Sequence, residues 1–316
     1  MKYLKQNVCA FISAMIWGTA FVAQSVCSEH IGPFTTTALR SVIAAVFLTV
    51  VVFLKRKVGR KKSVFKDKIY FKKLLSSGIV CGIILSMATI LQQTGIGDTG
   101  AGKTAFITAM YVVIVPVLGI FFKKKAGRGV WTAVAVAVIG FYFLCLHGDG
   151  GISLAVSDLF VLLCAFMFSV HIIVVDNVSD GVDGIELSCI QFYTASLLSL
   201  IFMLAYEKVI FLEIAACLLP LMYIGVFSSG IAYTLQIMAQ KGSNPTVISL
   251  ILALESVFAV LAEHIIGGTN VKSMTWWEIL GCALIFSAVL LSQIPFNELK
   301  KICITKKNRE GESLFF

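Results

Sequence analysis

A phosphate-binding pattern is the first chemical signal in the sequence. Residues 97–104, GDTGAGKT, match GxxxxGK(S/T), in which backbone amides cradle phosphates and the lysine, here Lys103, reaches them. That geometry requires a buried strand before the loop and an amphipathic helix after it. Residues 74–93 and 105–122 are instead apolar runs of helical length, and the second contains no charged residue. We therefore predict a loop between two membrane spans, with a nucleotide-driven membrane enzyme as the alternative.

Two charged side chains lie inside apolar runs, where a charge is expensive. On insertion scales, Arg40 and Glu255 each cost about 3 kcal/mol at a helix centre. Pairing with each other or with neighbours could offset that cost, and so could contact with water in a central cavity. In a cavity, Glu255 could accept a proton or meet a cationic group of a substrate. Glu263, two turns further along the same face and nearer the membrane surface, is expected to matter less.

Aromatic and amide side chains also recur at helical spacing within the apolar runs. Trp17, Phe21 and Gln24 are spaced i, i+4 and i+7, as expected for one face of a helix. Such a face suits a cavity that stacks on the apolar part of a solute and hydrogen-bonds its polar end, although hydrogen bonding between packed helices is the alternative for each residue. His171 could relay protons or contact a substrate, or simply bond to a neighbour. The candidate residues for substrate binding and translocation are Trp17, Gln24, Arg40, Gln93, Thr108, Tyr111, His171, Gln191, Tyr233, Gln236 and Glu255.

The elements that must position these residues are membrane helices. The chain has 316 residues, of which 58% are hydrophobic and 14% charged, so it has too few polar residues to coat a soluble core. Nine cysteines show no CxxC or paired spacing, which argues against a disulfide framework or a zinc site, and neither a cofactor, a metal site nor an enzyme is indicated. Apolar runs of about 20 residues predict an all-α membrane protein of ten transmembrane helices. Their centres are expected near Met15, Ala44, Ile84, Val113, Val138, Cys164, Leu197, Phe227, Ser256 and Ile285.

The positive charge is distributed unevenly between the connections. Most of the 26 Lys and Arg residues fall in alternate connections and in the tail, while the opposite set holds only Lys103, Lys208 and Lys272. By the positive-inside rule, both termini are expected in the cytoplasm. The link at residues 177–186 is acidic and lacks lysine, which departs from this pattern. The basic residues 55–73 are expected to set topology and touch anionic lipid rather than bind nucleic acid.

A weak internal repeat divides the chain into two halves. Residues 91–93, LQQ, precede Pro116, and residues 234–236, TLQ, stand in a similar position before Glu255. Five spans in each half would enter the membrane in opposite directions, and such inverted repeats are common in secondary transporters. The expected units are a first five-helix repeat at residues 1–150, a second at 151–297 and a cytoplasmic tail at 298–316.

Several segments, in this order, resemble the EamA-type transporters of the drug/metabolite transporter superfamily. They are IWGTAFVAQ (residues 16–24), TTTALR (35–40), GKTAFITAMYVVIVPVLG (102–119), AFMFSVHIIVVD (165–176), IQFYTASLLSL (190–200) and AQKGSNPTVISLILALESVFAVLAE (239–263). The resemblance covers nearly the whole chain. It implies two inverted five-helix repeats around a central cavity. The chain departs from the family where Ser256 and Thr269 stand, since such proteins often have Glu-Pro at the first place and an acidic residue near the second.

Together, the residues and the resemblance predict a multi-pass secondary transporter of the plasma membrane. The expected activity is export of a small organic metabolite, such as an amino acid, by alternating access without ATP hydrolysis. A membrane receptor or scaffold that does not transport is the alternative from another class. A homodimer remains open as the oligomeric state.

Overall fold

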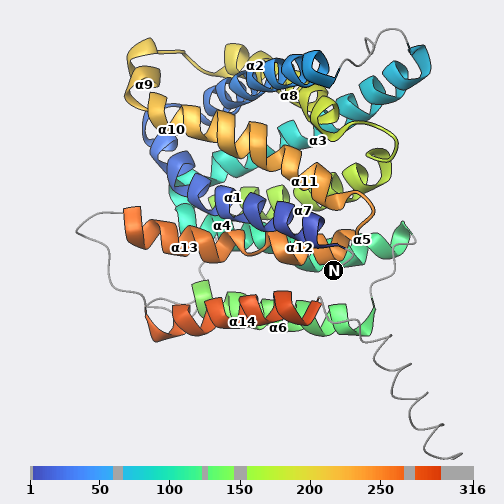
Figure 1. Ribbon diagram of the computed structural model, residues 1–316. Coiled ribbons are helices and arrows are strands. Elements are labelled where there is room, and N and C mark those ends of the chain that lie inside the picture. The colour runs from blue at the N-terminus through green and yellow to red at the C-terminus, as the bar shows by residue number, and fades with distance from the viewer. Residues whose placement is uncertain (1–2, 60–66, 123–126, 146–154, 267–274, 293–316) are drawn as a thin grey trace, which may run out of the picture.

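The protein is a bundle of helices packed side by side (Figure 1). The computed structural model describes residues 3–59, 67–122, 127–145, 155–266 and 275–292, and every regular element in these ranges is helical. The helices are α1 (Leu4–His30), α2 (Pro33–Gly59), α3 (Lys68–Thr99), α4 (Ala101–Ala109), α5 (Tyr111–Phe121), α6 (Arg128–Cys145), α7 (Val156–Val178), α8 (Gly184–Tyr206), α9 (Phe211–Ala216), α10 (Leu218–Tyr223), the π-helix η2 (Ile224–Ala232), α11 (Tyr233–Gln240), α12 (Pro245–Leu252), α13 (Glu255–Ile266) and α14 (Trp276–Ser292).

The structure confirms the expected class, an all-helical membrane protein. Among the described residues, eight helical segments are long and apolar enough to cross a membrane. Shorter apolar helices cover 129–143 and 279–292, and these belong to α6 and α14. Each predicted span centre falls inside a helix. The count of ten complete crossings stays a prediction, because α6 and α14 are shorter than the roughly 20 residues that a bilayer core requires.

Three of the spans are not continuous α-helices. The fourth breaks at Met110 between α4 and α5, and the ninth breaks at Ala253 and Leu254 between α12 and α13. The eighth passes from α10 through the π-helix η2 into α11. Pro116 lies inside α5, more than a turn beyond the break. Each of these irregular segments interrupts the regular α-helical hydrogen bonding of its span.

The helices pack in pairs that join the two halves of the chain. α1 packs on α13, η2 and α11, whereas α3 packs on α7 and α8, and α2 lies along α8. α6 and α14 form a separate layer at one edge of the bundle (Figure 1). There, a Cβ on Gly140 would lie 3.0 Å from the Gly281 carbonyl oxygen, so the missing side chain allows the two backbones to meet.

Charged contacts close one end of the bundle. Lys55 Nζ lies 2.5 Å from Asp183 Oδ2, and Arg56 Nη2 lies 2.6 Å from Glu186 Oε1. These bonds join the end of α2 to the start of α8. They also explain the acidic link at residues 177–186, because its carboxylates neutralise basic residues of α2 that would otherwise stand close together.

The other end of the bundle has a smaller set of polar contacts. Glu207, just after α8, accepts hydrogen bonds from the Phe34 and Thr35 amides and from Thr35 Oγ1 at the start of α2. Lys103 Nζ lies 2.7 Å from Asp158 Oδ2. The basic tail at 298–316, most of the loop within 55–73 and Thr269 lie outside the described residues.

Candidate functional site

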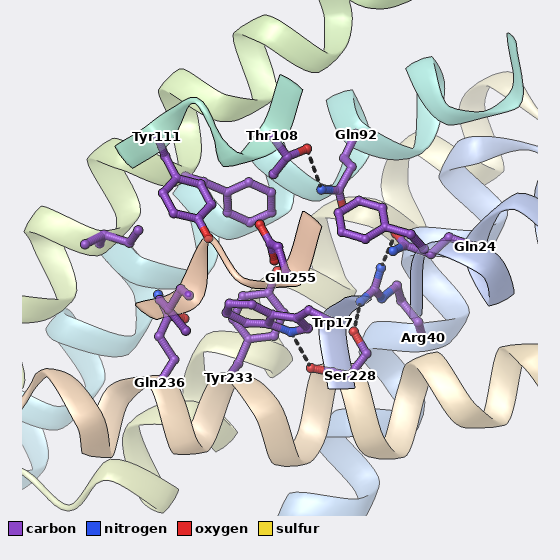
Figure 2. A pocket seen from close by; sticks show the side chains of 14 residues that line it. Trp17, Gln24, Arg40, Gln92, Thr108, Tyr111, Ser228, Tyr233, Gln236 and Glu255 are labelled. Carbon is purple, nitrogen blue, oxygen red and sulfur yellow. Dashed lines mark hydrogen bonds between the residues drawn. The ribbon is translucent and has the colours of Figure 1, made fainter. Parts of the chain in front are cut away.

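A small cavity lies where the middles of the spans meet (Figure 2). Its volume is about 30 Å³, which is room for about one or two water molecules. A molecule larger than this could enter only if the surrounding helices moved. The cavity is lined by Trp17, Phe21, Gln24, Arg40, Gln92, Thr108, Tyr111, Phe168, Ile172, Ser228, Tyr233, Gln236, Leu252 and Glu255.

Arg40 is held in the wall of the cavity by neutral oxygens. Its Nη1 donates to Gln24 Oε1 at 2.9 Å. Its Nε and Nη2 donate to Ser229 Oγ and Ser228 Oγ, each also at 2.9 Å. The guanidinium is buried, with 3% of the residue exposed. Its positive charge therefore has hydrogen-bond partners but no counter-charge in this set of contacts.

The two serines that bond to Arg40 are consecutive residues, Ser228 and Ser229. η2 contains both serines, and π segments are often found at functional sites. A Cβ on Gly225 would lie 2.6 Å from Ile43 Cγ2, so this glycine lets α2 approach η2 closely enough for the bonds to form.

Two aromatic rings, Trp17 and Tyr233, line the cavity together with Arg40 and Glu255. Trp17 and Tyr233 have ring centroids 4.7 Å apart at an angle of 58°, and Trp17 Nε1 donates to the Ser228 carbonyl at 3.2 Å. Figure 2 shows Arg40 on one side of the cavity and Tyr111 on the other, with Trp17 between them. Such rings suit contact with an apolar part of a ligand.

α1 reaches this position because it touches α13 at Gly18. A Cβ on Gly18 would lie 2.8 Å from the Glu255 carbonyl oxygen and 2.3 Å from Phe258 Cβ. The two helices therefore cross with their backbones nearly in contact. This crossing sets Trp17 and Glu255 against the same cavity.

Tyr111 and Glu255 face each other across the two helix breaks. The Tyr111 hydroxyl is close enough to the Glu255 carboxyl for the two groups to interact. Tyr111 Oη, Glu255 Oε1 and Gln236 Oε1 nevertheless make no hydrogen bond of ordinary geometry within the described part of the chain. Buried polar atoms normally have partners, so these three are available to water or to a ligand.

Several predicted candidates lie behind the cavity rather than in its wall. Gln93 is buried and donates from Nε2 to the Gln24 carbonyl at 3.1 Å. His171 and Gln191 bond to each other, with 3.3 Å between Nε2 and Oε1. The structure thus favours the helix-packing alternative for these three residues. The remaining candidates, Trp17, Gln24, Arg40, Thr108, Tyr111, Tyr233, Gln236 and Glu255, all line the cavity.

The candidate set missed some lining residues. Gln92 donates from Nε2 to Thr108 Oγ1 at 3.2 Å and holds that side of the wall. Gln92 is a second amide beside Gln93 inside an apolar run, and that position in the sequence could have marked it as a candidate. Little in the sequence indicated Ser228, because small hydroxyl residues are common in packed membrane helices. Phe21, which the helical spacing places on the same face as Trp17 and Gln24, also lines the cavity. The others are Phe168, Ile172 and Leu252, whose apolar side chains resemble any core residue.

The phosphate-binding pattern at residues 97–104 forms no phosphate cradle. It spans the end of α3 and the start of α4, so a helix rather than a strand precedes Lys103. Gly100, with φ of 81°, makes the tight turn between the helices. Lys103 Nζ is bonded to Asp158, and Thr104 is fully buried. The segment is a helical corner, as the flanking apolar runs predict.

Comparison with protein families decides the identity of this architecture. A model of the EamA-like transporter family matches residues 4–146 and again residues 155–293. The chain belongs to the EamA-like transporter family. It is therefore a multi-pass membrane transporter, and the family indicates a small-molecule substrate.

Relatives of this EamA-like transporter are also described as transporters. An uncharacterized transporter of Archaeoglobus fulgidus is 27% identical over 292 residues, which cover 92% of this chain and 86% of the relative. The uncharacterized transporter YoaV of Bacillus subtilis is 24% identical over 298 residues, covering 90% and 96%. One solved structure, described only as a crystal structure of a protein, has a TM-score of 0.75 at 15% identity and covers 93% of this chain and 98% of its own. That likeness shows the fold alone.

The EamA-like chain also shows how its ninth span breaks without a proline after Glu255. Ser256 stands at that position, and its Oγ donates to the Ala253 carbonyl at 2.8 Å. The same carbonyl also accepts from the Ser256 amide at 3.2 Å, so Ser256 bonds to it through both its backbone and its side chain. Glu255 still begins a new helix.

Proposed function

We propose that this EamA-like transporter exports a small organic metabolite, such as an amino acid, across the plasma membrane by alternating access. The observation that carries the proposal is the central cavity, which holds a buried guanidinium, a buried carboxyl and aromatic rings. Ionisable groups inside a membrane protein commonly mark a substrate or ion pathway. Arg40 and Glu255 do so here from different halves of the chain.

The chemistry of the cavity supports a solute with opposite charges. Arg40 already has three neutral acceptors, and a carboxylate would supply the negative charge that these lack. Glu255 could face an ammonium group or carry a proton, and its Oε1 has no hydrogen bond within the described residues. Trp17 and Tyr233 would pack on the apolar part of the solute. An amino acid combines all three features.

The broken spans support movement around this cavity. The cavity is too small for an amino acid, so helices must separate at one end and then at the other. The breaks at Met110 and at Ala253 adjoin Tyr111 and Glu255, respectively, and each can act as a hinge. Transport by this route needs no nucleotide, which agrees with the helical corner at Lys103.

The membrane orientation belongs to the same proposal. We infer that the end of the bundle bearing Lys55 and Arg56 faces the cytoplasm together with both termini, because basic residues favour that side. The plasma membrane is the compartment in which export would occur. Whether the protein forms a homodimer stays a prediction.

Counterflow in proteoliposomes tests the proposal. Purified protein is reconstituted with one unlabelled amino acid inside, and uptake of the same labelled amino acid is followed without ATP, across a panel of acidic, basic, aromatic and aliphatic amino acids. Saturable counterflow of at least one member is expected. Correctly folded protein that moves none of them would contradict an amino acid substrate, and a wider panel of metabolites with the same outcome would favour a receptor or scaffold. Efflux from preloaded cells, compared with uptake by the same cells, tests the outward direction.

A further inference from the structure

A second hollow lies at the basic end of the bundle, away from the central cavity. Its volume is about 250 Å³, and its walls come from the start of α1, the end of α2, the start of α8 and the end of α11. The charged residues in the wall are Lys5, Lys55, Lys241 and Asp183. Three positive charges thus surround one negative charge.

The carboxylate of the hollow, Asp183, already has hydrogen-bond partners on both oxygens. Asp183 Oδ2 accepts from Lys55 Nζ at 2.5 Å, and Asp183 Oδ1 accepts from the Ile185 amide at 3.1 Å. Lys241 Nζ donates to the Val182 carbonyl, which is a neutral partner. Within the described chain Lys5 forms no ion pair. The hollow therefore retains an excess of positive charge that an anion would neutralise.

The protonation equilibria of two groups agree with that electrostatic balance. Burial lowers the pKa of Lys241, and the neighbouring Lys55 lowers it further, while nearby aspartates act in the opposite direction. Burial raises the pKa of Asp183, but the hydrogen bond and charge of Lys55, together with the Ile185 and Glu186 amides, outweigh burial and leave that pKa below its usual range. Asp183 thus stays ionised at neutral pH, and an anion beside Lys241 would relieve the repulsion between the lysines.

An apolar groove adjoins this hollow on the side of the bundle. The groove has a volume of about 210 Å³ and shares Ile185 and Met238 with the hollow as a common wall. Among the described residues that line it, only Thr234 has a polar side chain, and its hydroxyl already bonds to Ser188 Oγ and the Gly230 carbonyl. The lining of the groove therefore favours an apolar ligand.

The groove follows one face of α2 away from the charged end. Lys55, Val51 and Leu48 are spaced i, i−4 and i−7, so they lie above one another on that helix. From Phe47 to Lys55 the combined lining extends over nine residues, or about 12 Å along the axis at 1.5 Å per residue. A cationic pocket at the membrane surface that continues as an apolar groove into the apolar layer has the two-part character of a phospholipid.

We propose that the hollow and groove together bind one anionic phospholipid, with its phosphate among Lys5, Lys55 and Lys241 and an acyl chain along the groove. A free anion would use the lysines alone, whereas the groove recognises only a molecule with a hydrocarbon chain. The bound lipid bridges α1, α2, α8 and α11. It therefore stabilises the folded bundle by an amount that rises with the lipid concentration relative to the Kd.

The experiment measures lipid binding to the purified full-length chain in detergent. Thermal stabilisation and native mass spectrometry are compared for dioleoylphosphatidylglycerol and for dioleoylphosphatidylcholine, which has the same chains but no net charge. Inorganic phosphate alone is the third ligand. Phosphatidylglycerol is expected to bind most tightly, and phosphate is expected to have little effect at the same concentration. Equal binding of the two lipids, or equal stabilisation by phosphate alone, would overturn the proposal.

Matched variants separate this site from general attraction to basic residues. Lys5→Gln and Lys241→Gln are each expected to weaken phosphatidylglycerol binding about fivefold, because a lysine near an anionic lipid surface contributes about 1 kcal/mol. Lys57→Gln removes a charge from the same end of α2 outside the hollow and is expected to have little effect. An equal loss in Lys57→Gln would show unspecific electrostatics and reject the site.

A second pair of variants tests the groove without changing charge. Val51→Trp fills the groove and is expected to weaken phosphatidylglycerol binding at least fivefold, whereas Val50→Trp, at an exposed position outside the groove, is expected to leave it unchanged. Unchanged binding in folded Val51→Trp would refute the acyl-chain part. If Val51→Trp does not fold, the lysine variants and the two lipids still decide the proposal.

Discussion

Tyr111 and Glu255 hold matching positions in two different broken spans. Tyr111 is the first residue of α5 after the break at Met110, and Glu255 is the first residue of α13 after the break at Ala253 and Leu254. Both side chains are buried and both line the central cavity. Bending at either break would therefore move a polar group that lines the cavity.

Glu255→Gln tests whether the buried carboxyl takes part in transport. The amide keeps the size and hydrogen-bonding capacity of the side chain but removes its charge and proton exchange. We expect normal insertion and folding, with counterflow reduced at least about tenfold or its pH dependence lost, because a role in binding or proton transfer requires the acid. Glu263→Gln, at an exposed position on the same helix, is the control and should transport normally. Wild-type transport by Glu255→Gln across pH would dismiss the role.

Arg40→Lys tests the hydrogen bonds that hold the guanidinium. Lysine keeps the charge but cannot reproduce the planar fork that reaches Gln24, Ser228 and Ser229. We expect thermal unfolding in detergent to show a loss of about 1–3 kcal/mol, because buried oxygens lose their donors. Arg56→Lys alters a partly exposed ion pair and should cost about 0–1 kcal/mol. Equal effects of the two changes would contradict this account of Arg40.

Gly18→Ala tests the close crossing of α1 and α13. The added methyl group would meet the Glu255 carbonyl oxygen at 2.8 Å, so the two helices must separate. We expect a loss of about 1–3 kcal/mol in unfolding free energy, as for other overpacked positions, together with reduced transport. Gly97→Ala is a fair comparison because its Cβ would stand 3.6 Å from Ser28 Oγ, an ordinary contact. If both variants behaved alike, the crossing would not depend on Gly18.

Lys103→Ala tests the structural role of the phosphate-binding pattern. Asp158, whose side chain is 1% exposed, would lose its bond from Lys103 and remain buried. We expect about 1–3 kcal/mol less stability, reduced from the value for a fully buried pair because the lysine is partly exposed. ATP binding should stay at background in both proteins, and Lys208→Ala should leave stability unchanged. Saturable ATP binding that disappears in Lys103→Ala would restore the nucleotide alternative.

Cysteine labelling tests the orientation of the bundle. In a background in which the native cysteines are replaced, Lys57→Cys and Lys208→Cys introduce exposed thiols at opposite ends. An impermeant reagent added to intact cells should label the second and leave the first unlabelled until the membrane is opened. The reverse result would invert the proposed topology.

The sequence alone determined the class of the protein and much of its cavity. Apolar runs long enough for a bilayer are a local property, so the span centres could be predicted from residues near each one. The spacing of Trp17, Phe21 and Gln24 also predicted one face correctly, since the helical period is local, and all three line the cavity. The family resemblance could also be recognised from the sequence, because its motifs are local segments that occur in order along the chain.

Only the tertiary structure decided which polar residues turn toward that cavity. Gln92 lines it while the adjacent Gln93 bonds to the Gln24 carbonyl, and the difference depends on how α3 is rotated against its neighbours. The partner of Lys103 is Asp158, and the partners of Arg40 include Ser228 on a π-helix that no sequence pattern indicated. These contacts join residues far apart in the chain. The rotation of each helix about its axis is set by how all the helices pack together, and local periodicity carries no information about that.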